Sequence, residues 1–412
     1  MSRPGFWNMG TAGILLSGLS DLTGQFLLGY LVDLRGRSHA MNINISSIFL
    51  ASVFTLFSLF TDKWPVLAAI VAPLLKCFGG GSHASAFLAL TLLRSEQDIS
   101  LRSAYYYGTG AVAVLAQCLA SFATPLLAKH SPFLPYALSV VCCTFAYGAV
   151  ALYKKFDPIS ASRTEVESPD AAIREPLIPN AEPPSHNENQ QSGNLLAVLT
   201  SRLDNYTGHT FLSGNNNMTI VIWIFSLMAI SKATRPLFTT YIQHRDGLSS
   251  QQAQILWLVR SIMSVVVFGF VLPAVVLKLQ PNNWTASNVT LYAARISIIL
   301  MGLGAFLIGT SGSLASITTA LVINTLGVAT DLSVLAFSAD FFSEGTAGRI
   351  LMLIASCESA GTLVGIGFLY PIYQYSLDNS LLFLAGGVPY YICAAIYAIV
   401  AVLIWTLVPI SH

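Results

Sequence analysis

The sequence predicts an all-α integral membrane protein that crosses a bilayer many times. Three observations support this: 54% of the 412 residues are hydrophobic, only 9% are charged, and apolar runs of about 20 residues recur along the chain. A soluble globular protein carries about 25% charged residues, so lipid rather than water should surround most of this chain. Helices are expected because a helix hydrogen-bonds its own backbone while it crosses hydrocarbon.

Eleven runs are long and apolar enough to cross a hydrocarbon core of about 30 Å. Five precede a polar stretch and six follow it, so we expect an N-terminal transmembrane bundle over residues 1–153 and a C-terminal bundle over residues 219–412. The expected spans are, in order, 11–32, 42–61, 65–92, 104–128, 134–153, 219–241, 253–277, 289–310, 314–340, 348–372 and 381–409.

The polar stretch between the bundles, residues 154–218, is expected to be a flexible linker. Its Pro, Glu, Ser and Asn content cannot bury enough apolar surface to fold. Within it, Leu195, Leu199 and Leu203 recur every four residues. This spacing favours a short helix on the membrane surface, and a mostly disordered stretch with a few leucines is the alternative.

Basic residues in the short loops predict which face of the membrane each loop lies on, because cytosolic loops carry an excess of Lys and Arg. In the N-terminal bundle one set of loops contains only Lys63 and Lys129. The other set, which should be cytosolic together with the linker, carries Arg35, Arg37, Arg94, Arg102, Lys154 and Lys155. We expect a multi-pass protein of the plasma membrane.

Several functional classes lack support in the sequence. A net charge of +1 gives no basic surface for nucleic acid. The six cysteines lie in apolar stretches and no CxxC or HxxxH spacing occurs, so we expect neither a disulfide framework nor a metal site, and no cofactor. The sequence contains no GxxxxGK[ST] loop, which would indicate ATP-driven transport. It also contains neither HExxH nor GxSxG, which would indicate a membrane enzyme.

The loop after the first span carries the most specific motif. It reads GYLVDLRGRS, and its residues Gly29, Asp33, Gly36 and Arg37 have spacings that resemble the signature G-x-x-x-D-[RK]-x-G-R-[RK] of the major facilitator superfamily of transporters. The resemblance implies that Gly29 permits close helix packing. It also implies that Asp33 accepts charge-assisted hydrogen bonds from basic groups or a helix N-terminus while one gate is shut.

The motif departs from the signature at two positions. Leu34 stands where a basic residue is usual, and Ser38 ends the run, so Arg35 is expected to substitute in the charge network of the gate. A generic positive-inside loop with a turn glycine is the alternative interpretation. It explains the arginines but not the spacing of the glycines and the aspartate.

Two further segments resemble the same superfamily. LLKCFGGGSHASAF, in the third span, is similar to the family's fourth-helix pattern of a basic residue followed by a glycine-rich turn, with Lys76 in place of Arg and Gly80 within the glycine run. SKATRPLFTTYIQHRDGLSSQQAQILWLVRS resembles the seventh helix and the start of the eighth in fungal members. The resemblance implies two bundles and a twelve-helix plan. Since the signature follows the first visible span, we expect the chain to lack the plan's first helix.

Charged residues inside the expected spans are candidates for a substrate or proton pathway, because charges at that depth are costly. Asp21 lies 12 residues before Asp33 and Lys76 lies 11 residues into its span. At about 1.5 Å per residue these positions have similar depths, so an ion pair that couples protons to transport is one hypothesis. A structural pair without a coupling role is the alternative.

The second half contains a further set of charges within its spans. Asp331 and Glu358 lie about 13 Å from the cytosolic side on consecutive helices and could share a site. Lys232, Arg235 and Arg260 lie toward the outer half and are candidate counter-charges or anchors for an anionic substrate. For the two arginines, snorkelling to the headgroups is the favoured alternative.

Polar and aromatic residues in the first half have simpler interpretations. His83 is expected to be a satisfied packing residue rather than a proton relay. Tyr105, Tyr106 and Tyr107 open a span on the cytosolic side, where an interfacial aromatic belt is expected.

Taken with the resemblance, these observations predict a monomeric secondary active transporter for a small organic solute. Its two bundles would rock about a site near the midplane, with protons as the expected coupling ion. The few charges and many aromatics in the core favour a moderately apolar solute, and the fungal resemblance favours efflux of a metabolite or drug. A nutrient-uptake carrier and a non-transporting sensor or inactive relic are the alternatives.

Overall fold

The chain is described here by a computed structural model. It describes residues 9–60, 65–94, 102–131, 133–156, 216–247, 250–279, 286–341, 347–378 and 387–408. Within these ranges the regular structure is helical and contains no strand. Ten stretches of helix in the described residues are long and apolar enough to cross a membrane. The prediction of an all-α polytopic membrane protein is therefore confirmed.

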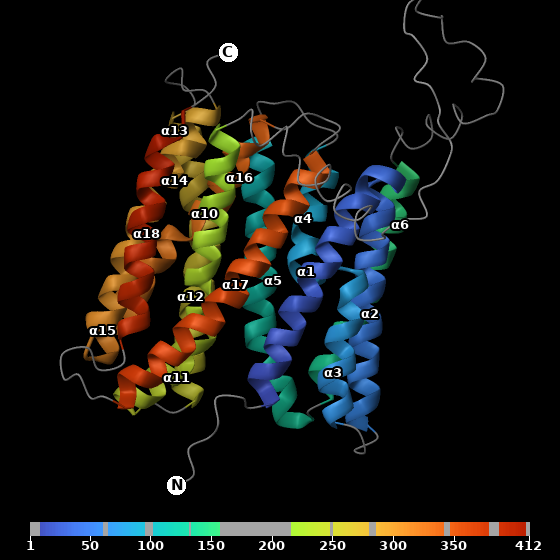
Figure 1. The fold of residues 1–412 in the computed structure, drawn as a ribbon, viewed down its shortest axis with the longest axis horizontal. Helices are drawn as coiled ribbons and strands as arrows, with labels where there is room; N and C mark the ends of the chain where they lie inside the picture. The colour runs from blue at the N-terminus through green and yellow to red at the C-terminus, as the bar shows by residue number, and fades with distance from the viewer. Residues whose placement is uncertain are drawn as a thin grey trace, which may run out of the picture.

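The N-terminal half forms the bundle on the right of Figure 1. Its elements are α1 (Met9–Arg35), α2 (Arg37–Phe60), α3 (Pro65–Leu75), the 3₁₀ turn η1 (Lys76–Phe78), α4 (Gly81–Arg94), α5 (Arg102–His130) and α6 (Leu134–Phe156). The expected single span over residues 65–92 is wrong in one respect, because η1 and two glycines interrupt it. The other four expected spans of this half are continuous helices.

Glycines cause the interruption, and neighbouring helices compensate for it. Gly80 and Gly81 have φ angles of 65° and 68°, a region that favours glycine. Asn44 of α2 donates to the carbonyl oxygens of Gly79 and Gly81, and Gln25 of α1 donates to that of Gly80 at 3.2 Å. Because backbone groups in hydrocarbon must be satisfied within the protein, these amides explain why polar residues occur in apolar spans.

The C-terminal half forms the bundle on the left of Figure 1. Its elements are α10 (Asn216–Lys232), α11 (Thr234–Asp246), α12 (Ser250–Val266), the π-helical η4 (Val267–Val271), α13 (Leu272–Leu279), α14 (Ala286–Thr310), α15 (Leu314–Leu326), η6 (Gly327–Ala329), α16 (Thr330–Ser338), η7 (Ala339–Phe341), α17 (Ala347–Asp378) and α18 (Val388–Thr406). Three of the six spans thus change helix geometry partway across. Discontinuous helices of this kind commonly line sites in membrane transport proteins.

The expected linker is bounded by α6 and α10. Helix α6 continues to Phe156 and α10 begins at Asn216. Residues 157–215, which include the expected surface helix, lie outside the described residues.

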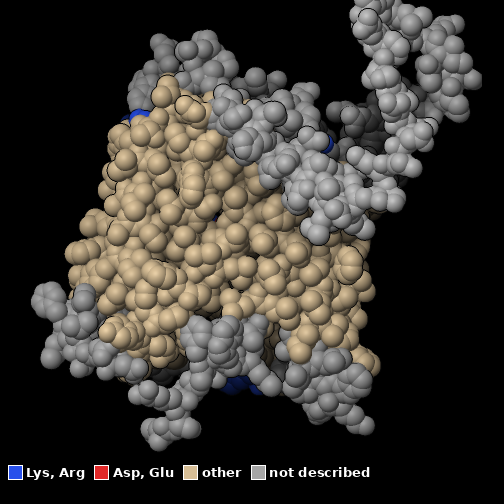
Figure 2. Space-filling model, in the orientation of Figure 1, with Lys and Arg blue, Asp and Glu red and all other residues tan. Residues whose placement is uncertain are grey.

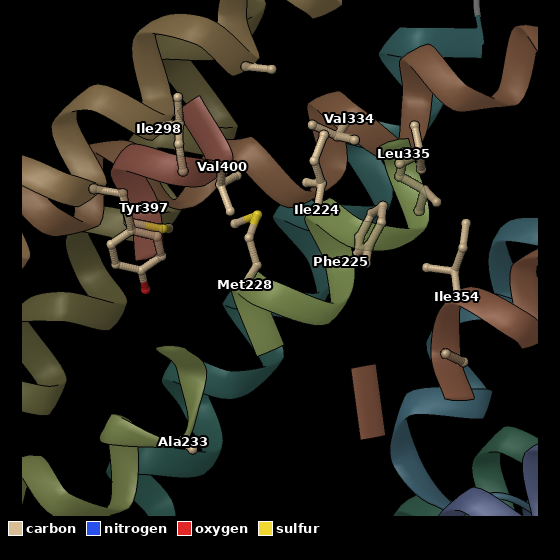
Figure 3. Packing of buried hydrophobic residues seen from close by; sticks show 14 of the residues in the cluster. Ile224, Phe225, Met228, Ala233, Ile298, Val334, Leu335, Ile354, Tyr397 and Val400 are labelled. Carbon is tan, nitrogen blue, oxygen red and sulfur yellow. The ribbon is translucent and has the colours of Figure 1, made fainter. Parts of the chain in front are cut away.

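The apolar core and the apolar surface both fit a bilayer. In Figure 3, Met228 and Ile224 of α10 face Val400 of α18 and Val334 of α16 in a tightly packed cluster. Helix α5 exposes Leu119, whose side chain is 62% accessible, together with other large apolar residues. The face seen in Figure 2 is uncharged across its middle, with Lys and Arg visible only at its margins. Lipid is the solvent that such a surface requires.

Candidate functional site

The most concentrated set of charges in the described residues is a buried cluster around Lys232. The Nζ atom of Lys232 lies 2.7 Å from Oδ2 of Asp331 and also donates to Oε1 of Glu358. The three side chains are only 14%, 22% and 10% exposed, respectively. We call Lys232, Asp331 and Glu358 the charge cluster.

Helix ends hold two members of the charge cluster. Lys232 is the last residue of α10, and Asp331 lies in the first turn of α16, directly after the break at η6. A cation is stabilised at a helix C-terminus and an anion at a helix N-terminus, because the backbone dipoles align along the axis. The C-terminus of α10 therefore stabilises the positive charge of Lys232, and the N-terminus of α16 stabilises the negative charge of Asp331.

Two glycines bring the third member into reach. A Cβ atom at Gly361 of α17 would lie 2.5 Å from the carbonyl oxygen of Ser226, and one at Gly365 would lie 2.5 Å from that of Ile230, both on α10. Small residues at this spacing let two membrane helices approach closely. Glu358 is one turn before Gly361 on the same helix, so this approach carries its carboxylate to the end of α10.

Polar contacts connect the charge cluster to the N-terminal bundle. The Nδ1 atom of His83 on α4 lies 3.8 Å from Oε2 of Glu358. Beside it, Gln25 of α1 donates to the hydroxyl of Ser359 at 2.8 Å. In Figure 1, α1 and α17 lie side by side at the boundary between the bundles. The charge cluster therefore lies where the two bundles meet.

The structure brings Asp331 and Glu358 together, as the sequence analysis expected, and their shared partner is Lys232. The expected ion pair between Asp21 and Lys76 does not form. The ion pairs within 4.0 Å among the described membrane charges involve Lys232 or His83 instead. A depth estimate gives the height of a residue along the membrane normal but not the direction of its side chain, and this explains the error.

Asp21 and Lys76 lie in different surroundings. A Cβ atom at Gly81 would lie 2.2 Å from Oδ1 of Asp21, so the carboxylate rests against the glycine break. Lys76 lines a cavity of about 580 Å³ between α2, α3, α5 and α6, together with Ser52 and Tyr136. Lys76 and His83 still interact electrostatically with Asp21. Gly80 contributes the turn between them rather than a polar side chain.

The favoured interpretation of the sequence, in which Arg235 of α11 and Arg260 of α12 extend to the headgroups, is wrong. Both line an internal cavity of about 30 Å³ beside Lys232. The Cζ atom of Arg260 lies 5.1 Å from the ring centre of Trp257. This is a cation–π contact, which stabilises an arginine inside a protein.

The loop motif of the expected gate joins α1 to α2. Gly36 has a φ of 86°, which only glycine adopts readily, and Gly29 is buried in α1. Arg37 donates from Nη1 to the carbonyl oxygen of Thr91 at 3.0 Å, near the end of α4. The side chains of Asp33 and Arg35 lie outside the described residues, so the expected charge network of the gate stays a prediction.

Sequence reasoning missed several polar contacts between helices. Tyr106 and Tyr107 are 3% and 2% exposed, so they do not belong to an interfacial belt, whereas Tyr105 is 41% exposed. The hydroxyl of Tyr107 lies 3.0 Å from that of Ser333 on α16, and His83 faces Glu358 instead of merely packing. Isolated polar residues within apolar spans were the available signal, but their partners are more than 200 residues away.

Comparison with known proteins finds similar folds among solved structures but no match in sequence. No protein-family model matches the chain, and no curated protein matches it in sequence. Among solved structures, the human organic anion transporter MFSD10 (TETRAN) superposes with a TM-score of 0.64 at 14% identity over 95% of this chain and 83% of that one. The major facilitator proton:xylose symporter XylE superposes with a TM-score of 0.66 at 12% identity, over 97% and 86% of the two chains.

A bacterial homologue of the iron transporter ferroportin, in its outward-facing state, is also similar. Its TM-score is 0.64 at 11% identity, over 98% of this chain and 91% of that one. At these identities the likeness concerns the fold. The chain has the two-bundle fold of the major facilitator superfamily, as the resemblance of its motifs implied.

Proposed function

We propose that this protein is a secondary active transporter, which moves a small organic solute across a membrane by alternating access of its two bundles. The observation that carries the proposal is the charge cluster, in which Lys232 and Asp331 lie at breaks in their spans and Lys232 is shared by Asp331 and Glu358. Charges at such depth are costly and mark pathways, and broken helices form midplane sites in secondary transporters. Proton coupling, efflux and a monomer in the plasma membrane complete the proposal.

Glu358 is the residue through which we propose that protons act. It accepts a hydrogen bond from Lys232, faces His83 across the bundle boundary, and interacts electrostatically with Arg235. A proton on Glu358 would remove its negative charge and leave Lys232 paired with Asp331 alone. It would also end the attraction to a protonated His83. The protonation of one residue would thereby be linked to the separation of two bundles.

Flux into proteoliposomes that hold the full chain tests the proposal. A panel of neutral, anionic and cationic radiolabelled organic solutes is offered under pH gradients of either direction. We expect at least one solute to accumulate above equilibrium, and a protonophore to abolish the accumulation. Glu358→Gln should still exchange that solute across the membrane without accumulating it. The direction of the gradient that drives accumulation distinguishes efflux from uptake.

Asp21→Asn is the comparison variant in this assay, since Asp21 is the other candidate proton carrier. Normal accumulation by Asp21→Asn together with its loss in Glu358→Gln assigns coupling to the charge cluster. The reverse pattern assigns it to Asp21. Flux no greater than in protein-free vesicles, for every solute, would contradict transport and favour the sensor or relic alternative.

A further inference from the structure

Two arginines of the C-terminal bundle have no carboxylate in direct contact once the charge cluster is accounted for. Lys232 binds both carboxylates. No carboxylate of the described residues lies within 4.0 Å of Arg235 or Arg260. The cavity region thus holds three cations and only two acids. An uncompensated charge inside a protein is costly unless an anion pairs with it.

The two arginines share one cavity. It has a volume of about 30 Å³ and is enclosed by α10, α11, α12, α14, α15 and α18. A single water molecule needs about 10–15 Å³ of such space. The cavity therefore has room for about two oxygen-sized groups, which suits both oxygens of a carboxylate or two of the oxygens of a phosphate group but not a whole organic solute.

A buried hydroxyl beside the cavity also lacks a partner. Tyr390 of α18 lines the cavity, is only 4% exposed, and its Oη atom has no hydrogen-bond partner in the part of the chain that the structure describes. A buried polar group without a partner is unfavourable. The amide of Asn324, by contrast, is already used, because it donates to the carbonyl oxygen of Met301 at 2.9 Å.

The neighbours of Arg260 position its guanidinium for binding. It lies over the ring of Trp257. Trp257 is itself held by a 3.1 Å hydrogen bond from Nε1 to Thr239 and by the ring of Phe238, 5.5 Å away. A guanidinium has five N–H donors, and a cation–π contact does not require all of them. In Figure 3 the hydroxyl of Tyr397, another cavity residue, points away from the apolar cluster of Ile298 and Val400.

We propose that the cavity lined by Arg235, Arg260 and Tyr390 binds the oxyanion group of an organic anion, either a carboxylate or a phosphate. The two arginines are positively charged and can only donate, and the unpaired hydroxyls of Ser231 and Tyr390 can donate as well. The complementary ligand therefore supplies acceptor oxygens and negative charge. That this anion is the transported substrate rests on the proposed function; the binding itself does not.

Binding to the purified full chain in detergent tests the site, by isothermal titration calorimetry with benzoate, phenyl phosphate and uncharged benzamide. We expect benzoate, phenyl phosphate or both to bind, and benzamide not to bind. Arg260→Gln and Arg235→Gln should each weaken anion binding at least about 30-fold, the typical effect of removing one partner of a buried charge pair. Tyr390→Phe should weaken it about fivefold. The relative affinities of benzoate and phenyl phosphate identify the preferred group.

Two further variants serve as controls. Lys278→Gln removes one positive charge from the exposed end of α13, outside the cavity, and should bind like the wild type. Arg260→Lys keeps the charge and should retain part of the affinity. If Arg260→Gln fails to fold, Arg235→Gln and Tyr390→Phe decide. Benzamide binding as tightly as benzoate, folded variants that bind normally, or no binding of either anion at millimolar concentration would overturn the site.

Flux of the same compounds separates this inference from the proposed function. Benzoate that binds to the purified protein but shows no flux in proteoliposomes supports the anion site and contradicts transport. Flux of benzamide without any anion binding supports transport and contradicts the anion site.

Discussion

Lys232, the last residue of α10, donates a hydrogen bond to Glu358 in the interior of α17, 126 positions later in the chain. The same ammonium group binds Asp331, so removal of one cation exposes two acids at once. This geometry makes the charge cluster a structural element as well as a candidate site. The two roles predict different responses to substitution.

Lys232→Met is expected to lower the free energy of unfolding by about 3–5 kcal/mol, because it leaves buried carboxylates uncompensated. The triple variant Lys232→Met, Asp331→Asn, Glu358→Gln should recover most of that stability without recovering coupled flux. Unfolding in mixed detergent micelles measures the first effect and the proteoliposome assay the second. A triple variant as unstable as the single one would show that charge compensation is not what stabilises this region.

Gly361→Ala is expected to cost about 1–3 kcal/mol through overpacking, since the new Cβ would meet backbone of α10. Gly367 is the matched control on the same helix, because a Cβ there meets nothing within 4 Å. Gly367→Ala should be neutral or stabilising by up to about 1 kcal/mol. The same unfolding measurement compares them, and equal effects would argue against close packing of α10 on α17.

Tyr107→Phe removes a hydroxyl that connects α5 to α16 across the bundle boundary. A neutral hydrogen bond contributes about 0.5–1.5 kcal/mol, so the population with separated bundles should rise about 2- to 12-fold. Distances between spin labels at the exposed positions 152 and 303 report this population. Tyr105→Phe, at an exposed neighbouring ring, should leave the distances unchanged. An identical response of both variants would contradict a role for the Tyr107 contact.

Arg37→Ala removes the hydrogen bond that joins the start of α2 to the end of α4. Hydrogen bonds to charged groups contribute about 1.5–3 kcal/mol, so we expect a loss of stability in that range and faster amide hydrogen exchange in the last turn of α4. Lys278→Ala, at an exposed basic residue of α13, should do neither. Unchanged exchange at residues 91–94 in Arg37→Ala would contradict the contact.

The loop charges predict that positions 37 and 155 face the cytosol and position 129 the opposite side. Single cysteines at these positions, in a variant without the six native cysteines, can be tested with a membrane-impermeant maleimide on intact cells. Only the cysteine at 129 should react before the membrane is permeabilised. Labels on 37 and 155 at opposite faces would contradict the predicted topology.

From the amino-acid sequence alone we could predict that lipid surrounds this protein, that it is all-α and roughly where its spans lie. Those properties follow from composition and from runs of consecutive apolar residues, which act locally along the chain. The sequence also identified Asp331, Glu358 and Lys232 as membrane charges of interest, because any charge in an apolar run stands out. An amide such as Asn44 attracted no attention, although it satisfies the carbonyl groups of a break on another helix.

The pairing of the charges, in contrast, depends on how the helices pack in three dimensions. Spacing along one helix gives depth, whereas pairing depends on the rotation of each helix and on how closely its neighbours pack. As a result, Lys232 forms ion pairs with two acids, whereas the carboxylate of Asp21 packs against Gly81. For the same reason Arg260 lies in an internal cavity instead of extending to the headgroups. These contacts join segments that are far apart in sequence, and no local pattern encodes their geometry.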